Sequence, residues 1–182
     1  MDSTLGILEM QKTEKVCRRM ASPTSCPCTT MPDLSLRLQH FKECITFIHD
    51  CRLNGGSCLV HCLAGVSRST TMVVAYLMTV THYSWEDCLS AVKAVRSFVG
   101  PNYGFLEQLQ EYQTGQVSEY RAWLQSNFSP NPFKDEEQVG TLLSQYKEQQ
   151  ESQRRGVDHR WINQRMGVAA LPPDSDESEG NS

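Results

Sequence analysis

The stretch that organises the chain is CLVHCLAGVSRS, residues 58–69. It begins with Cys58-Leu59-Val60, a short apolar run without alternation, which is typical of a strand covered on both faces in a parallel sheet. It leads into residues 69–81, which are apolar almost all round and therefore predict a helix at the centre of a domain. This order predicts an α/β domain with a short, mostly parallel sheet flanked by helices.

The loop between the predicted strand and helix contains Cys62, five further residues and then Arg68. A loop that closes onto a helix N-terminus directs several backbone N–H groups at one point, where the helix dipole adds positive potential. Gly65 permits the tight backbone path that such a cradle requires. The guanidinium of Arg68 can bond two phosphate oxygens, and the same field favours the thiolate form of Cys62 as a nucleophile. The loop is therefore predicted to bind a phosphate.

Helical spacing recurs on both sides of this loop. Upstream, apolar residues three and four apart predict a helix that ends at residues 54–56, Asn-Gly-Gly: Leu38, Phe41, Ile45 and Ile48. Downstream, Ser84 with Asp87 three residues later predicts the N-cap of a second helix. Two further helical patterns follow, one with Phe105, Leu106, Leu109 and Tyr112 and the other with Tyr120, Trp123 and Leu124.

The composition divides the chain into three segments. Residues 1–33 have no sustained period and end rich in Ser, Thr, Pro and Cys, which indicates a divergent, disordered segment. Residues 34–130 hold the helical patterns and the loop, so they are interpreted as the folded domain. Residues 131–182 are rich in Gln, Glu, Arg and Ser, which indicates a polar, mostly disordered tail with one helix near residues 138–149.

The charge balance limits the partners. Lys plus Arg total 17 against 21 Asp plus Glu, a net charge of -4, which argues against nucleic-acid binding. The longest uncharged run, residues 69–85, falls short of the ~20 apolar residues of a membrane span. No apolar core with a cleavage site occurs near the N-terminus, so the cytoplasm, with the nucleus as a second location, is expected. Position 2 is Asp2 rather than glycine, so no N-myristoyl site is expected.

Eight cysteines are present, at positions 17, 26, 28, 44, 51, 58, 62 and 88. Without a secretion signal they are interpreted as reduced thiols rather than as a disulfide scaffold. The Cys26-Pro27-Cys28 pair has no second pair at zinc spacing, so neither a metal nor another cofactor is expected.

The motif HCLAGVSRS resembles the active-site motif of the cysteine-dependent dual-specificity protein phosphatases, and residues 40–123 are similar to an atypical branch of that family. The resemblance implies that residues 34–130 are a catalytic domain that hydrolyses phosphotyrosine, and further phosphoserine and phosphothreonine, in proteins through a phosphocysteine. It implies that Cys62 is the nucleophile, that Arg68 binds the phosphoryl group and that Ser69 assists departure of the thiolate. The phosphate-binding residues that it implies are Leu63, Ala64, Gly65, Val66, Ser67 and Arg68.

The resemblance also implies supporting residues and partners. His61 either hydrogen-bonds the loop from behind or has a purely structural role, and Asn102 either supports the loop or belongs to an ordinary turn. The uncharged Leu63, Ala64 and Val66 favour phosphoproteins over phosphoinositides, whose phosphatases carry lysines in this loop. Components of kinase pathways, the mitogen-activated and JNK pathways among them, are the implied substrates.

The chain departs from the family pattern at its N-terminus, which predicts an N-terminally truncated domain. The family supplies an aspartate on an upstream loop as general acid. Counting back from His40 places that position near Thr30 or Met31, and neither side chain donates a proton. Asp33 is the nearest carboxylate, and it is either a replacement acid or an ordinary loop residue beside Pro32.

A missing general acid lowers the rate by ~10²–10⁴-fold, and most for serine and threonine phosphates, whose leaving groups need a proton. Two alternatives to a competent phosphatase therefore stay open. The first is a catalytically weak phosphate-binding or scaffold variant. The second is a shortened chain that folds only with a partner.

Overall fold

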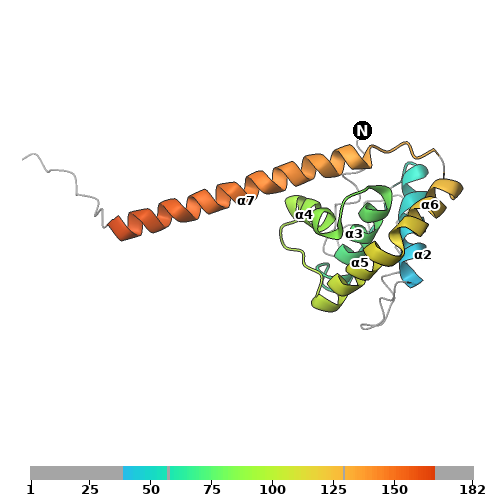
Figure 1. Cartoon of the computed structure of the whole chain (residues 1–182), viewed down its shortest axis with the longest axis horizontal. Coiled ribbons are helices and arrows are strands. Elements are labelled where there is room, and N and C mark those ends of the chain that lie inside the picture. The colour runs from blue at the N-terminus through green and yellow to red at the C-terminus, as the bar shows by residue number, and fades with distance from the viewer. Residues whose placement is uncertain (1–38, 57, 129, 167–182) are drawn as a thin grey trace, which may run out of the picture. The chain divides into compact units, whose positions relative to one another are not determined.

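The computed structural model describes residues 39–56, 58–128 and 130–166. This part of the chain contains six helices (Figure 1): α2 (Gln39–Leu53), α3 (Arg68–Val80), α4 (Trp85–Val95), α5 (Tyr103–Gly115), α6 (Val117–Asn127) and α7 (Asp135–Met166). The chain forms two units, Met1–Lys147 and Glu148–Ser182, and the site and core described below belong to the first.

Helix α3 lies at the centre of the first unit. Every residue from 69 to 79 is buried, which confirms the helix predicted there. Helices α2, α4, α5 and α6 all pack against α3 (Figure 1). These four neighbours cover the all-round apolar surface of α3. The loop of residues 61–67 leads directly into this buried helix.

Local signals define the helix ends as predicted. Gly55, with φ of 69°, follows the end of α2 and donates its N–H to the Arg52 carbonyl at 3.0 Å. The side chain of Ser84 accepts from the Asp87 N–H at 3.2 Å and caps α4. Each of these contacts joins residues no more than three apart, so the sequence alone specifies them.

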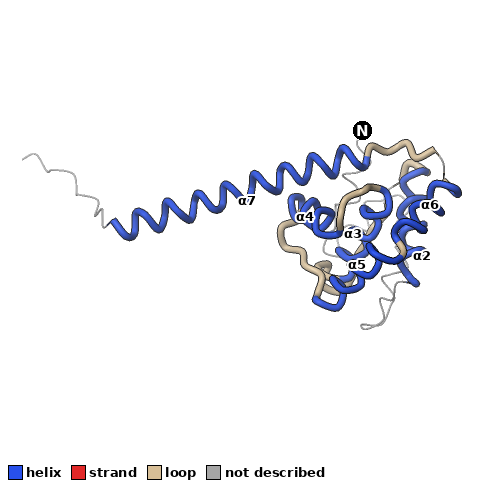
Figure 2. The backbone as a smooth tube through the Cα atoms, in the orientation of Figure 1, coloured by secondary structure: helices blue, strands red, loops and turns tan. Residues whose placement is uncertain are grey.

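The predicted short, mostly parallel sheet is wrong for the described residues, which contain no strand (Figure 2). Leu59 has only an isolated bridge geometry, although Cys58, Leu59 and Val60 are buried with exposed fractions of 7%, 7% and 3%. An unbroken apolar run indicates burial on both sides, but it does not specify a hydrogen-bonded partner strand. Residues 1–33, to which the predicted truncation refers, lie outside the described residues.

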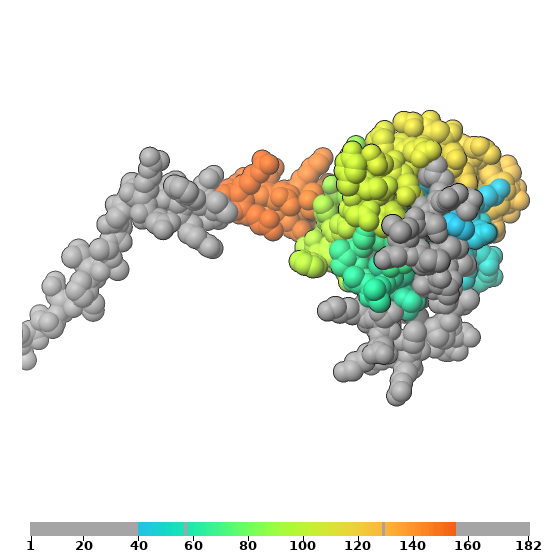
Figure 3. All heavy atoms as spheres, turned by 90° about the horizontal axis from the view of Figure 1, so that it is seen from below, coloured from blue at the N-terminus to red at the C-terminus, as the bar shows by residue number. Residues whose placement is uncertain are grey.

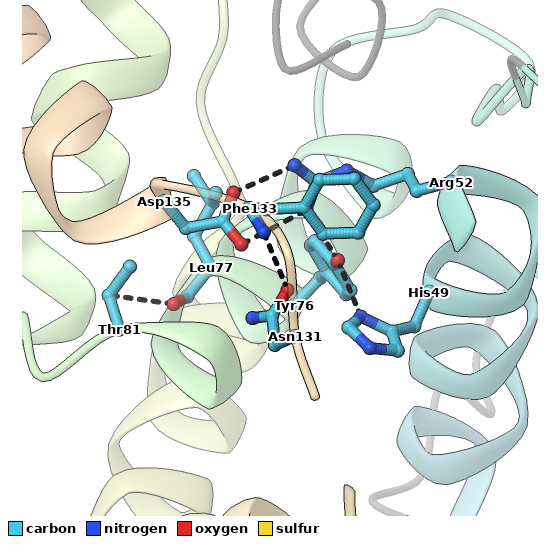
Figure 4. A network of polar contacts seen from close by, with 8 residues as sticks. All are labelled: His49, Arg52, Tyr76, Leu77, Thr81, Asn131, Phe133 and Asp135. Atoms are coloured by element: carbon cyan, nitrogen blue, oxygen red, sulfur yellow. Dashed lines mark hydrogen bonds and ion pairs between the residues drawn. The ribbon is translucent and has the colours of Figure 1, made fainter. Parts of the chain in front are cut away.

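A buried polar network joins α7 to α2 and α3 (Figure 4). The guanidinium of Arg52 donates to both carboxylate oxygens of Asp135, at 2.8 and 3.1 Å, and to the Tyr76 hydroxyl at 2.7 Å. That hydroxyl also lies 3.0 Å from Nδ1 of His49, and the Phe133 ring lies 3.8 Å from the guanidinium carbon. The start of α7 is thus tied to the core by contacts between residues far apart in the sequence.

The helix predicted near residues 138–149 is present but longer, because it runs from Asp135 to Met166. The prediction of a mostly disordered tail is therefore wrong for these residues. Val139 and Leu143 on its first turns are buried in the core cluster. Neither α7 nor any other helix in the described part of the chain is long and apolar enough to cross a membrane. The domain boundaries after residues 33 and 130 stay predictions.

Candidate active site

The phosphate loop, residues 61–67, runs from the buried residues 58–60 to the first residue of α3. The Gly65 N–H donates to the Cys62 carbonyl at 3.2 Å and closes a tight turn. Gly65 has φ of 64°, and a Cβ at this position would lie 3.3 Å from Nη2 of Arg96. The left-handed backbone favours glycine at this position, and a larger residue would also push the end of the Arg96 side chain away by a few tenths of an ångström.

Cys62 lies at the base of this loop with an exposed fraction of 6%. Burial by itself raises the pKa of the thiol, but hydrogen bonds from the side chain and backbone of Ser69 act in the opposite direction. Backbone N–H groups of Val66 and Ser67 add to them, and the pKa falls from 9.0 to about 7. The balance makes Cys62 substantially a thiolate at neutral pH, as a nucleophile requires.

Ser69 lies on the first turn of α3 and is fully buried behind the cysteine. Its Oγ is 3.4 Å from Sγ of Cys62. A hydroxyl in this position donates to a thiolate and stabilises it each time the sulfur carries the negative charge. The structure thus brings together two of the predicted catalytic residues, Cys62 and Ser69.

The other predicted residues occupy distinct places. Arg68 is the first residue of α3 and is half-buried, and His61 is half-buried directly before the cysteine. Leu63 and Ala64 are exposed on the outer side of the loop. Asp33 lies outside the described residues, so its role as general acid stays a prediction.

Residues after α4 support the loop from outside. The Gly100 N–H donates to the Val66 carbonyl at 3.1 Å, and the Asn102 N–H donates to Oγ of Ser67 at 3.0 Å. The Asn102 side chain accepts from the Phe105 N–H at 2.9 Å and caps α5. Asn102 therefore contacts the loop through its backbone, while its side chain has the ordinary capping role of a turn residue.

Arg96 is a site residue that the sequence reasoning missed. Its guanidinium lies against Gly65, and Nη1 is buried without a hydrogen-bond partner in the described residues. This places the positive charge of Arg96 beside the loop. In the sequence, Arg96 is a basic residue a few positions before the Gly100-Pro101-Asn102 turn. An ordinary surface arginine at the end of a helix would look the same, so the sequence does not distinguish the two.

Together the loop offers a thiolate nucleophile, a left-handed glycine turn, converging N–H groups and the guanidinium of Arg96, with Arg68 on the first turn of α3, and this arrangement suits a phosphate ester. Residues 10–115, more than half of the chain, match the family described as "Dual specificity phosphatase, catalytic domain". The chain therefore belongs to the dual specificity phosphatase family.

Individual relatives agree with this family assignment. The chain is 65% identical over 133 residues to dual specificity protein phosphatase 22-A of Danio rerio, covering 73% of this chain and 64% of that protein. It is 52% identical over 118 residues to dual specificity protein phosphatase 22 of Homo sapiens, covering 65% of this chain and 64% of that protein. The chain thus spans just under two thirds of the length of these relatives.

A solved structure is also similar. The crystal structure of DUSP15 matches with a TM-score of 0.51 and 43% sequence identity, over 59% of this chain and 78% of that chain. The family match begins at residue 10, upstream of residue 34, where the sequence analysis placed the start of the catalytic domain.

Proposed function

We propose that the chain is a protein phosphatase that hydrolyses phosphotyrosine, and more slowly phosphoserine and phosphothreonine, through a phosphocysteine on Cys62. The observation that carries the proposal is the Cys62 thiol, which is held in a converging set of donors that lower its pKa to about 7. Phosphoprotein components of kinase pathways are the proposed substrates, and the cytoplasm and nucleus are the proposed location.

In the first step the Cys62 thiolate attacks phosphorus. The P–S bond forms while the P–O ester bond breaks, and the ester oxygen leaves with the electron pair and takes up a proton. Arg68 and the loop N–H groups hold the non-bridging oxygens, which carry the charge in the transition state. Asp33 is the proposed proton donor, and a phenol needs this proton less than an alkoxide does.

In the second step water attacks the phosphocysteine. The P–O bond forms and the P–S bond breaks, the water gives its proton to the carboxylate that Asp33 became in the first step, and inorganic phosphate leaves with the thiolate restored. The Ser69 hydroxyl, 3.4 Å from the sulfur, donates to the departing thiolate and lowers the barrier of this step.

The first experiment compares turnover of an aryl phosphate, a phosphotyrosine peptide and a phosphothreonine peptide. The Cys62→Ser variant is expected to abolish turnover of all three substrates. Cys88→Ala is the matched control, because Cys88 is fully buried and its pKa is raised to about 12. Undiminished turnover in Cys62→Ser would refute the mechanism, and phosphopeptide binding without wild-type turnover would indicate the phosphate-binding variant.

The second experiment measures alkylation of Cys62 by iodoacetamide against pH, read by mass spectrometry. The rate is expected to rise with pH and to reach half its maximum near pH 7, because the thiolate is the reactive form. Ser69→Ala should move this midpoint upward, while Ser126→Ala at an exposed helix position should not. An unshifted midpoint in Ser69→Ala would contradict the proposed hydrogen bond.

A further inference from the structure

The exposed large apolar side chains of the described residues are concentrated in two segments. Leu63, Val95, Phe98 and Tyr103 have exposed fractions of 92%, 42%, 84% and 75%. Leu63 belongs to the phosphate loop, and the other three belong to the end of α4, the α4–α5 connection and the start of α5. Burial of these exposed apolar side chains against a binding partner would be favourable, because it removes apolar surface from water.

These two segments are joined to each other at the candidate active site. The hydrogen bonds from Gly100 to Val66 and from Asn102 to Ser67, at 3.1 and 3.0 Å, connect the α4–α5 connection to the phosphate loop. In Figure 3 the surface of the loop region, in teal, adjoins the lime surface of the segments around residues 95–105. The exposed apolar residues therefore flank the phosphate cradle.

The depth of the site determines what lies over these residues. Cys62 has an exposed fraction of 6%, whereas the next residue, Leu63, has 92%. The organic part of a phosphate ester that reaches the sulfur therefore extends outward to the surface on which Leu63 is exposed. A peptide attached to that ester continues over the adjacent surface, where Phe98 and Tyr103 are exposed.

We propose that Leu63, Phe98 and Tyr103 form an apolar rim that binds a bulky apolar side chain next to the phosphotyrosine of a phosphopeptide substrate. The inference rests on the proposed phosphatase function. A phosphopeptide is the occupant because the rim adjoins a loop that holds the backbone donors around Cys62 and the Arg96 guanidinium, and an anionic ester with an apolar neighbour complements both features. A partner that is apolar alone would not use the backbone donors that surround Cys62.

The test uses two phosphotyrosine peptides that differ only in the flanking residues, leucine in one and serine in the other, together with an aryl phosphate. In the wild-type chain, kcat/KM is expected to be about 10-fold higher for the leucine peptide, which corresponds to ~1.4 kcal/mol. Partial burial of one aromatic side chain supplies a free energy of this size.

Matched variants separate apolar contact from other effects. Phe98→Ser and Tyr103→Ser are expected to reduce the preference for the leucine peptide to within about twofold, since each removes apolar contact area. Phe98→Leu and Tyr103→Phe should retain the preference, because they keep an apolar surface. Far-UV circular dichroism and the urea midpoint of each variant verify that the fold is intact.

Equal kcat/KM values for the two peptides in the wild-type chain would overturn the rim while leaving the phosphatase function in place. Absent turnover of every substrate would instead contradict the proposed function. In that case the affinities of the two peptides for the Cys62→Ser variant are measured by fluorescence polarisation. Tighter binding of the leucine peptide would support the apolar rim, and equal affinities would overturn it. A Phe98→Ser change that alters only vesicle binding or self-association also overturns it.

Discussion

Removing the carboxylate of Asp135 is expected to destabilise the fold strongly. Asp135 and Arg52 have exposed fractions of 2% and 3%, and two hydrogen bonds of 2.8 and 3.1 Å join the guanidinium to the carboxylate. Asp135→Ala would leave a buried positive charge without its counter-ion. Solvation cannot replace the lost carboxylate at this depth, so the cost is much larger than for a surface pair.

The magnitude follows from the partners that remain. Breaking a buried ion pair by removing one partner costs about 3–5 kcal/mol. The Tyr76 hydroxyl at 2.7 Å and the Phe133 ring at 3.8 Å still contact the guanidinium, so we expect the lower end of that range. Removing both charges, in Arg52→Met with Asp135→Leu, should recover most of the loss, since no buried charge then lacks a partner.

The assay is urea unfolding followed by circular dichroism. With a slope near 1.5 kcal/mol/M, a loss of ~3 kcal/mol lowers the midpoint by about 2 M. Glu137→Ala is the matched control, because this residue lies on the same first turn of α7 but its side chain is 71% exposed, and its loss should change stability by less than ~1 kcal/mol. Equal midpoints for Asp135→Ala and Glu137→Ala would refute the reasoning.

Two further predictions concern a titration and a backbone conformation. Burial, followed by the charge of Arg52, lowers the pKa of His49 below 6.5. The unfolded chain then binds the proton more readily, so the free energy of unfolding should fall as pH drops below 6.5, by at most ~1.4 kcal/mol per pH unit. In urea titrations, His49→Gln should flatten the pH dependence of the free energy of unfolding, whereas His82→Gln should leave it unchanged. Identical pH profiles for the two variants would contradict the role given to His49. Gly65→Ala should cost ~1–2 kcal/mol of stability and lower kcat/KM at least ~10-fold, because φ is 64°. Gly104→Ala should change neither stability nor kcat/KM, because φ is normal there and no neighbour lies closer than 3.8 Å to the added Cβ. Equal kinetics in the two variants would refute this explanation.

The features predicted correctly from the sequence are those that depend on residues near each other in the chain. The N-cap at Ser84, the end of α2 at Gly55 and the buried character of α3 all follow from interactions within a few residues or from the apolar pattern of one helix. The contact between Cys62 and Ser69 is also local, because the two residues lie seven apart in one stretch of chain and their side-chain atoms are 3.4 Å apart.

The incorrect or missed features depend on distant segments. The apolar run at residues 58–60 correctly indicated burial, but it did not show whether the segment pairs as a strand in the described region. Strand pairing needs a partner from elsewhere in the chain, which a local pattern does not reveal. Arg96 reaches Gly65 only because the segment after α4 folds back onto the phosphate loop.

The sequence by itself thus determined where the helices of the core lie, how α4 is capped and where α2 ends, because these features depend on hydrogen bonds and apolar periods within a few residues. Only the tertiary structure decided that Asp135 pairs with Arg52 across 83 residues and that Phe98 and Tyr103 flank the loop that holds Cys62. Such contacts depend on which surfaces the packed helices bring together, and no local pattern of charge or hydrophobicity specifies that choice.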